Sequence, residues 1–387
     1  MRQEEKRHHA IGERVELESG RPRVLHVTSA WGAGVQTALI EYARQGRGYE
    51  HHLVHSLDNE FLIDSELDGV FASRVAAPSG YSSLVRTARR EIRQVNPDVL
   101  HLHSAVAGGL GRIFLAGGRA RPAIVYSPHA YLFERAYLAR PVRSGVRACE
   151  MLLARRTDLT VGVSPYEVRL AESLGSKARY VPNIVTDAPQ EARWLGAEAG
   201  NSEGLPQITT IGRLMPQKDP DFFLATIEEA RKEGLQARWT WIGTGNEQDV
   251  GRLRTAGVEV TGWLSRAKTF EILCRSACYV HTAAWEGSPM SILEAATVGV
   301  PIVARSIPAI VSLGMPDRFS TPASLARGVI DVVSGRRIPT PPRVGDQNDQ
   351  ARALRLAYTE AVRQVEIRQT RAKSYGRHVG MDLDESK

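Results

Sequence analysis

Two series of strand-like segments alternate with amphipathic stretches along this chain. The first series, before residue 190, reads RVLHVTS, HHLVHSL, DVLHLHS, AIVYSPH and LTVGVS. The second series, after residue 206, reads QITTIGR, ARWTWIG, VEVTGW, CYVHTA and PIVAR. Short runs rich in β-branched residues that alternate with helical patterns predict βαβ units and a parallel sheet. We therefore expect an α/β protein with two doubly wound, Rossmann-like domains in tandem.

The length of the chain fits this organisation. Its 387 residues exceed one typical domain, and 42% of them are hydrophobic, which is enough for two buried cores. A polar stretch rich in Pro, Gly and Ala separates the two series, and a helical repeat begins near residue 349. The expected parts are a disordered tail (1–20), a first domain (21–190), a linker (191–205), a second domain (206–345), a long helix (346–375) and a polar tail (376–387).

The sequence carries no sign of export or of a membrane span. The first twenty residues are charged throughout and lack the apolar run of a signal peptide. The three cysteines form no CxxC pair, which fits a reducing compartment. We expect a cytoplasmic protein whose formal net charge of +7 allows peripheral contact with the inner face of the membrane. The D-x-D at residues 382–384 lies in the polar tail, so we expect no metal site there.

A glycine pair, Gly32-x-Gly34, follows the first expected strand in the segment SAWGAGVQTAL. Glycines between a strand and a helix are typical of loops that bind nucleotides. The dinucleotide fingerprint expects Gly or Ala at its sixth position, where this chain has Thr37. Asp58 follows about twenty residues on, at the distance of the acidic residue that binds an NAD ribose. By itself the loop leaves a nicotinamide cofactor, another nucleotide ligand and a purely structural turn open.

Two loops of the second half carry further candidates for ligand binding. In GRLMPQKD, Arg213 and Lys218 follow a strand within one short loop, and two cations there suit a diphosphate. Two solvated surface cations are an equally simple interpretation of that loop alone. In WIGTGNE, Gly243 and Gly245 allow a tight turn into a helix.

The segment AAWEGSPMSILEAATVGVPIVA, residues 283–304, is the most informative of all. Glu286 stands in a loop after a strand, Ser288 is a predicted N-cap and Pro289 a predicted first helical residue. The free N–H groups near Met290 and Ser291 would suit an anion. Farther along the same helix a second glutamate, at position 294, would need hydroxyl partners beside such an anion. An alternative stays open, in which Glu294 belongs to a polar network of the core and Glu286 is merely a surface residue.

Glu286 and Glu294 form an E-x7-E pair that resembles the signature of the retaining, nucleotide-sugar-dependent glycosyltransferases of family 4. GRLMPQKD resembles that family's diphosphate loop, IGTGNE its glycine turn and VTGWLS its base-side loop. HLHSAVAG, YSPHAY, VGVSPYE and YVPNIV resemble further family segments in the same order, over residues 22–370. The resemblance implies the GT-B fold, in which two Rossmann-like domains face each other across a cleft and a C-terminal helix returns to the first domain.

The resemblance also implies a reaction and a set of roles. The protein would transfer a hexosyl or N-acetylhexosaminyl group from a nucleotide diphosphate sugar, UDP-linked, to a hydroxyl of a glycan or lipid-linked acceptor in surface polysaccharide synthesis, without a metal. Catalytic roles fall on His129, Arg213, Lys218 and Glu286. Donor-binding roles fall on Gly34, Gly243, Gly262, Ser288, Met290, Ser291 and Glu294. The acceptor side would include Gly32 and His103. A same-scaffold epimerase or phosphorylase, and an NAD-dependent oxidoreductase, remain as alternatives.

One basic segment, residues 134–156, points to a partner. It holds six arginines against two glutamates, with apolar residues at positions 137, 138, 142 and 146 between them. A basic face with apolar neighbours suits an anionic lipid surface, and hence a lipid-linked acceptor. A solvated helix face explains the same composition equally well.

Overall fold

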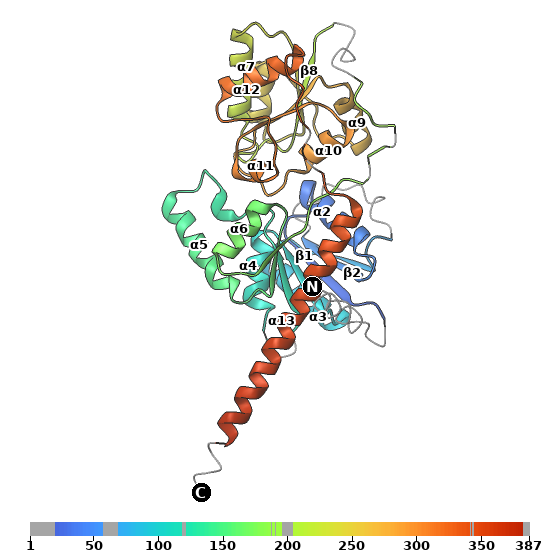
Figure 1. The fold of residues 1–387 in the computed structure, drawn as a ribbon, viewed down its shortest axis with the longest axis vertical. Coiled ribbons are helices and arrows are strands. Elements are labelled where there is room, and N and C mark those ends of the chain that lie inside the picture. The colour runs from blue at the N-terminus through green and yellow to red at the C-terminus, as the bar shows by residue number, and fades with distance from the viewer. Residues whose placement is uncertain are drawn as a thin grey trace, which may run out of the picture.

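The computed structural model describes residues 20–56, 69–117, 121–186, 188–189, 191–195, 204–340, 342 and 344–381. Asp58, the expected tail before residue 20, most of the expected linker and residues 382–387 lie outside this described part. Within it the chain forms two parallel sheets, one above the other in Figure 1, each covered by helices. The predicted α/β fold with two doubly wound units is confirmed.

The first sheet has seven parallel strands in the order β3-β2-β1-β4-β5-β6-β7. The strands are β1 (Arg23–Thr28), β2 (Glu50–Ser56), β3 (Ser73–Ala77), β4 (Val99–His103), β5 (Ala123–Ser127), β6 (Leu159–Gly162) and β7 (Ala178–Tyr180). The helices between them are α2 (Ala33–Gln45), α3 (Tyr81–Val95), α4 (Ala105–Phe114), the 3-10 turn η4 (Leu132–Glu134), α5 (Arg140–Ala154) and α6 (Pro165–Ser173).

The second sheet has six parallel strands in the order β10-β9-β8-β11-β12-β13. They are β8 (Gln207–Ile211), β9 (Arg238–Ile242), β10 (Val258–Val260), β11 (Cys278–His281), β12 (Ile302–Arg305) and β13 (Arg318–Phe319). The accompanying helices are α7 (Pro220–Lys232), α8 (Glu247–Thr255), α9 (Arg266–Arg275), α10 (Met290–Val298), α11 (Pro308–Ser312) and α12 (Pro322–Val333).

The last helix, α13 (Gln347–Met381), leaves the second domain and packs on the first (Figure 1). Its buried residues Leu354, Tyr358 and Ala361 join the apolar core on one face of the first sheet. The return of this helix confirms the prediction, but the helix runs on to Met381, six residues past the expected end at residue 375. Within the described part of the chain, no helix combines the length and the apolar composition that a membrane span requires.

Alternation along β4 explains why histidines collect inside the first sheet. Successive side chains of a strand point to opposite faces. Leu100 and Leu102 therefore join the core beneath α3 and α4, whereas His101 and His103 point to the face covered by α2 and α13. Nδ1 of His101 lies 3.0 Å from the hydroxyl of Tyr358 on α13. The sequence pattern HLH thus places two imidazoles side by side in the protein interior.

The two domains touch where their strands end. A Cβ on Gly34 would lie 3.2 Å from Cγ of Met290 in the other domain. A Cβ on Gly287 would lie 2.7 Å from Oε1 of Glu167 and 3.0 Å from the amide nitrogen of Ala130. The approach at Gly287 leaves no room for a Cβ, whereas a Cβ at position 34 would require the side chain of Met290 to shift slightly. Both contacts bring the loops of the two sheets together.

Candidate active site

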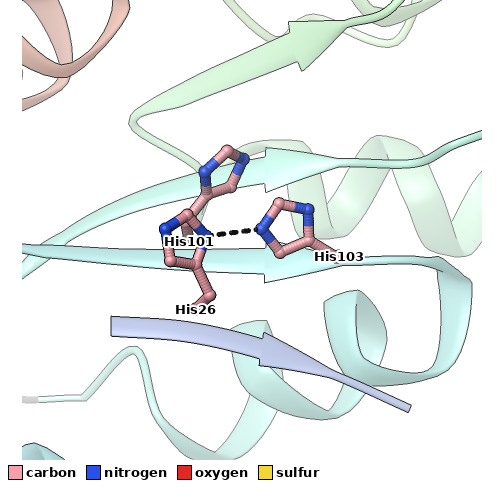
Figure 2. Close-up of side chains that lie close together, drawn as sticks. All are labelled: His26, His101 and His103. Atoms are coloured by element: carbon pink, nitrogen blue, oxygen red, sulfur yellow. Dashed lines mark hydrogen bonds between the residues drawn. The ribbon is translucent and has the colours of Figure 1, made fainter. Parts of the chain in front are cut away.

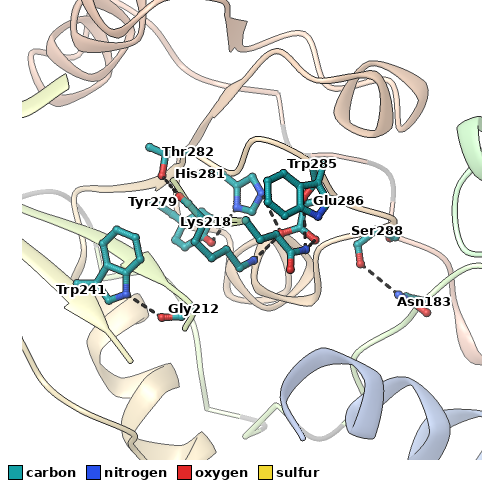
Figure 3. Close-up of polar contacts among 11 residues, drawn as sticks. Asn183, Gly212, Lys218, Trp241, Tyr279, His281, Thr282, Trp285, Glu286 and Ser288 are labelled. Atoms are coloured by element: carbon teal, nitrogen blue, oxygen red, sulfur yellow. Dashed lines mark hydrogen bonds and ion pairs between the residues drawn. The ribbon is translucent and has the colours of Figure 1, made fainter. Parts of the chain in front are cut away.

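Lys218 and Glu286 form an ion pair in loops that follow neighbouring strands of the second sheet. Lys218 follows β8 and Glu286 follows β11, and these two strands are adjacent and parallel. Nζ of Lys218 lies 2.6 Å from Oε1 of Glu286 (Figure 3), and the two side chains are 19% and 9% exposed. Because the carboxyl ends of parallel strands share one edge of the sheet, residues 68 positions apart meet there. Arg213, half-buried, lies in the same loop as Lys218.

The second carboxylate oxygen of Glu286 is also bound. Nε2 of Gln217 donates to this oxygen at 3.1 Å and to the carbonyl of Trp285 at 3.3 Å. The buried ring of His281 lies 3.8 Å from Oε1 of Glu286. Burial lowers the pKa of His281 well below its ordinary value, and the charge of Lys218 lowers it further. His281 is therefore neutral, and Lys218 balances the charge of the carboxylate.

Close packing of glycines shapes the loops under this pair. Gly212 and Gly243 have φ values of +154° and +133°. A Cβ on Gly212 would lie 2.7 Å from Cε of Lys218, and one on Gly243 would lie 2.2 Å from the carbonyl oxygen of Gly212. The indole of Trp241 donates to that same carbonyl at 2.7 Å (Figure 3), and the amide of Gly243 donates to the carbonyl of Gly262 at 3.0 Å. These glycines position the loop of Lys218 and Arg213.

Helix α10 begins one residue later than the sequence predicts. Pro289 has an extended ψ of 115° and occupies the cap position, so the first helical residue is Met290. The prediction of Ser288 as the N-cap is wrong, because Ser288 lies outside the helix and its carbonyl accepts from Nδ2 of Asn183 at 3.2 Å (Figure 3). No side chain caps this helix start. The amides of Met290 and Ser291 thus keep the anion-binding character of a helix N-terminus.

Glu294 lies on α10 at the contact between the domains. Its Oε1 accepts from Nη1 of Arg266 at 3.1 Å, and the same guanidinium reaches the hydroxyl of Thr37 on α2 at 3.5 Å. The side chain of Glu294 is 13% exposed, so it is not part of the apolar core. Gly34, near the start of α2, faces Met290. The amino-terminal glycine loop therefore lies against the start of α10.

His129 follows β5 on the other side of the contact. Both His129 and Ala130 have left-handed backbones, with φ values of 49° and 78°. Glu167 holds this turn, because its carboxylate accepts from the amides of Ala130 at 2.5 Å and Val163 at 2.9 Å. Burial raises the pKa of Glu167 to about 7, although these two hydrogen bonds oppose the shift. Gly287, next to Glu286, packs on this turn.

The two acceptor-side candidates, Gly32 and His103, are both buried. Gly32 turns the chain before α2 with φ of 145°, a conformation that favours glycine. His103 has 0% exposure, and its two ring nitrogens bind the rings of His26 and His129. Because other imidazoles occupy both nitrogens of His103 in this conformation, a contact of His103 with an acceptor stays a prediction.

Comparison with known proteins identifies the family. Residues 32–188 match the family model described as Glycosyltransferase Family 4, and residues 205–334 match the model described as Glycosyl transferases group 1. Together the two matches span both sheets. The chain belongs to the family 4 glycosyltransferases. Its fold is GT-B, and the nicotinamide interpretation of the Gly32–Gly34 loop is thereby set aside.

Individual relatives of this glycosyltransferase are distant. An uncharacterized 41.2 kDa protein in the cps region of Klebsiella pneumoniae is 23% identical over 312 residues, which cover 76% of this chain and 84% of that protein. The UDP-Gal:alpha-D-GlcNAc-diphosphoundecaprenol alpha-1,3-galactosyltransferase of Escherichia coli is 25% identical over 235 residues, covering 54% and 58%. The crystal structure of Anabaena Alr3699/HepE in complex with UDP-glucose superimposes with a TM-score of 0.64 at 14% identity, covering 91% of this chain and 99% of that one.

Proposed function

We propose that this glycosyltransferase moves a sugar from a UDP-sugar to a hydroxyl of a glycan or lipid-linked acceptor, with retention of the anomeric configuration, in the synthesis of a surface polysaccharide. The observation that supports it most is the Lys218–Glu286 pair, in a domain whose helix α10 has an uncapped start at Met290. The loop of Glu286 packs on the turn of His129 through Gly287. The UDP-glucose complex of a protein with the same fold and the galactosyltransferase relative support a UDP-sugar donor.

The donor diphosphate would lie between the cations and the helix start. Arg213, Lys218 and the free amides of Met290 and Ser291 all favour negative charge. Lys218 has three N–H donors, so it can keep its bond to Glu286 and still reach a phosphate oxygen. Glu294, which lies where α10 meets the first domain, would accept hydrogen bonds from ribose hydroxyls of the donor. Glu286 would orient the hydroxyls of the transferred sugar.

The transfer step then needs no protein nucleophile. The bond between the anomeric carbon and the diphosphate oxygen breaks, and a bond from that carbon to the acceptor oxygen forms on the same face. The acceptor hydroxyl gives its proton to the departing phosphate oxygen. Negative charge grows on the diphosphate during this step, so Lys218 and Arg213 stabilise the transition state more than the bound donor.

An acceptor-defined assay tests this proposal. The full chain is incubated with UDP-, GDP- and ADP-hexoses and with a polyprenyl-diphosphate-linked N-acetylhexosamine, and the product is analysed by proton NMR. We expect transfer from a UDP-hexose and an α linkage, because UDP-hexoses carry the α configuration. A β linkage would contradict retention, and transfer from GDP- or ADP-hexoses alone would contradict the UDP donor.

A basic and apolar patch on the first domain supports a lipid-linked acceptor. Not every residue of the basic segment 134–156 is available at the surface. Leu138 and Val146 are half-buried, and the guanidinium of Arg143 donates to the carbonyl of Phe133. Four other apolar side chains are 48% to 62% exposed where α4 and α5 end. We define the α4–α5 patch as Ile113, Phe114, Met151 and Leu152 with the arginines around them, Arg89, Arg155 and Arg156. We propose an anionic bilayer as its partner, because exposed apolar side chains with a basic rim match such a surface.

A further inference from the structure

Four imidazoles form a continuous hydrogen-bonded chain across the first sheet. Nε2 of His51 lies 3.0 Å from the carbonyl oxygen of Gly46, and Nδ1 of His51 lies 2.9 Å from Nε2 of His26. Nδ1 of His26 lies 3.0 Å from Nε2 of His103 (Figure 2), and Nδ1 of His103 lies 3.1 Å from Nε2 of His129. The first three residues come from the neighbouring strands β2, β1 and β4, and His129 follows β5.

The imidazole chain ends at the carbonyl oxygen of Gly46, and this end fixes the donor-to-acceptor direction of its hydrogen bonds. A carbonyl oxygen only accepts, so Nε2 of His51 carries the hydrogen and its Nδ1 must accept. A neutral imidazole has only one N–H, so each following ring must also carry its hydrogen on Nε2. This holds for His26, His103 and His129 in turn. Burial lowers the pKa of all four rings, to about 4 for His51 and His129, and the rings are therefore neutral near pH 7. Nδ1 of His129 is left as a lone pair, with no partner among the described residues.

We infer that the three buried histidines His51, His26 and His103 lock His129 in its Nε2–H form, so that its Nδ1 accepts a hydrogen bond from a hydroxyl of the donor sugar. The proposed function supplies one part of this inference, the position of the sugar beside His129. A sugar hydroxyl beside His129 can donate to Nδ1. A carboxylate there has only acceptor oxygens, which would face the lone pair of Nδ1 with no hydrogen between them. The lock therefore selects hexose donors over hexuronate donors, and the three buried histidines are positioning residues.

His101 lies beside the chain without belonging to it. Its Nδ1 binds the hydroxyl of Tyr358 at 3.0 Å and its Nε2 binds that of Ser127 at 2.9 Å. One nitrogen each of His26, His101 and His103 lies within 4.8 Å of the others, a spacing that also suits a metal ion. All six ring nitrogens of these three residues already have hydrogen-bond partners. Hydrogen bonding alone thus accounts for the buried cluster, and a metal ion would have to displace several of these bonds.

Nitrogen NMR of the imidazoles tests the lock without any substrate. Long-range proton–nitrogen spectra of the full chain, labelled at histidine nitrogens, report which ring nitrogen carries the hydrogen. We expect the Nε2–H form alone for His129, assigned through a His129→Gln variant. The variant His26→Leu removes both the acceptor for His103 and the donor to His51, so His129 should then populate both forms. His26→Gln keeps an acceptor and a donor and should restore much of the lock.

The control is His52→Gln on the same strand. His52 points to the opposite face, where it binds the hydroxyl of Ser73 at 2.8 Å, so the form of His129 should not change. In kinetics, we expect His26→Leu to reduce the preference for UDP-hexose over UDP-hexuronate about tenfold, the change typical of one hydrogen bond. A mixture of forms of His129 in the unaltered protein would overturn the inference, even if transfer is confirmed. Stoichiometric zinc or another bound metal by elemental analysis would overturn it too.

Discussion

At the scale of single residues, the proposed transfer reaction depends most on the Lys218–Glu286 ion pair. Replacing Lys218 by alanine should lower kcat about 10²–10³-fold, the usual loss for one donor to a developing anion. The donor KM should change less, because the diphosphate gains charge in the transition state. Steady-state transfer kinetics measure both. Lys232→Ala is the matched control, since Lys232 is an exposed lysine of the same domain that pairs with Glu229. An unchanged kcat would place the role elsewhere.

The sequence predicted the charged residues of this site better than their partners. Lys218, Glu286 and Glu294 lie in loops and at a helix start that the motifs mark. The sequence does not indicate Gln217 and Arg266 as partners of Glu286 and Glu294, because these contacts depend on distances in the folded chain that no sequence spacing encodes.

The sequence predicts only some of the histidines that cluster in the first sheet. Its motifs indicate His103 and His129 but not His26 and His51. Alternation within HLH assigns two histidines to one face of β4, but the neighbours of that face depend on strand order. The order β2-β1-β4 is a property of the whole sheet, so the sequence alone does not reveal the chain of imidazoles.

At the scale of elements, helix α6 is coupled to the turn of His129 through Glu167. The pKa of this buried carboxyl is raised from 4.5 to about 7, so the folded chain binds the proton more tightly than the unfolded chain. The stability that this adds is fully present below about pH 4.5 and is lost as the pH rises through about 7. The size of the loss is of the order of 3 kcal/mol, from about 1.4 kcal/mol per pKa unit.

Chemical denaturation at pH 5 and pH 8 measures this effect. Glu167→Gln does not titrate, so its free energy of unfolding should fall less between the two pH values than that of the unaltered chain. Glu172→Gln, an exposed change on the same helix, should behave like the unaltered chain. Equal losses for all three proteins would show that Glu167 is already ionised when folded.

Helix boundaries show where local patterns are insufficient. Ser288-Pro289 fits a helix start, yet the extended ψ of Pro289 delays helix α10 to Met290. Helix α13 continues to Met381, past the expected end at residue 375, although Gly376 and Gly380 lie in its last turns. The ten predicted strands fall on the β-branched runs, because burial on both faces makes those runs continuous. The edge strands β3, β7 and β13 were not predicted.

At the scale of the whole molecule, the α4–α5 patch predicts binding to membranes. The full chain should float with anionic liposomes at low salt and should dissociate at high salt, because the arginines are screened. A double variant, Leu152→Glu with Arg155→Glu, should abolish flotation. Arg254→Glu makes a similar change of charge on an exposed residue of the second domain and should leave it intact. Equal binding to neutral vesicles would contradict electrostatic docking, and an absence of binding at low salt would favour a soluble acceptor.

The alternation of segments was enough to predict two domains, but not the way in which they meet. The contacts of Gly287 with Glu167, of Gly34 with Met290 and of Arg266 with Thr37 depend on the angle between the domains. That angle follows from many weak contacts between distant segments, so no local pattern carries it.

Thermal unfolding of the full chain with nucleotides tests most directly whether these contacts form a nucleotide-sugar site. A ligand at 100 times its Kd stabilises the folded state by about 2.7 kcal/mol, so saturating UDP should raise the midpoint while the same concentration of NAD should not. The variants Lys218→Ala and Glu294→Ala should each reduce the shift caused by UDP, because one loses a diphosphate contact and the other a ribose contact. A shift caused by NAD alone, or a shift by UDP that both variants retain in full, would contradict the account.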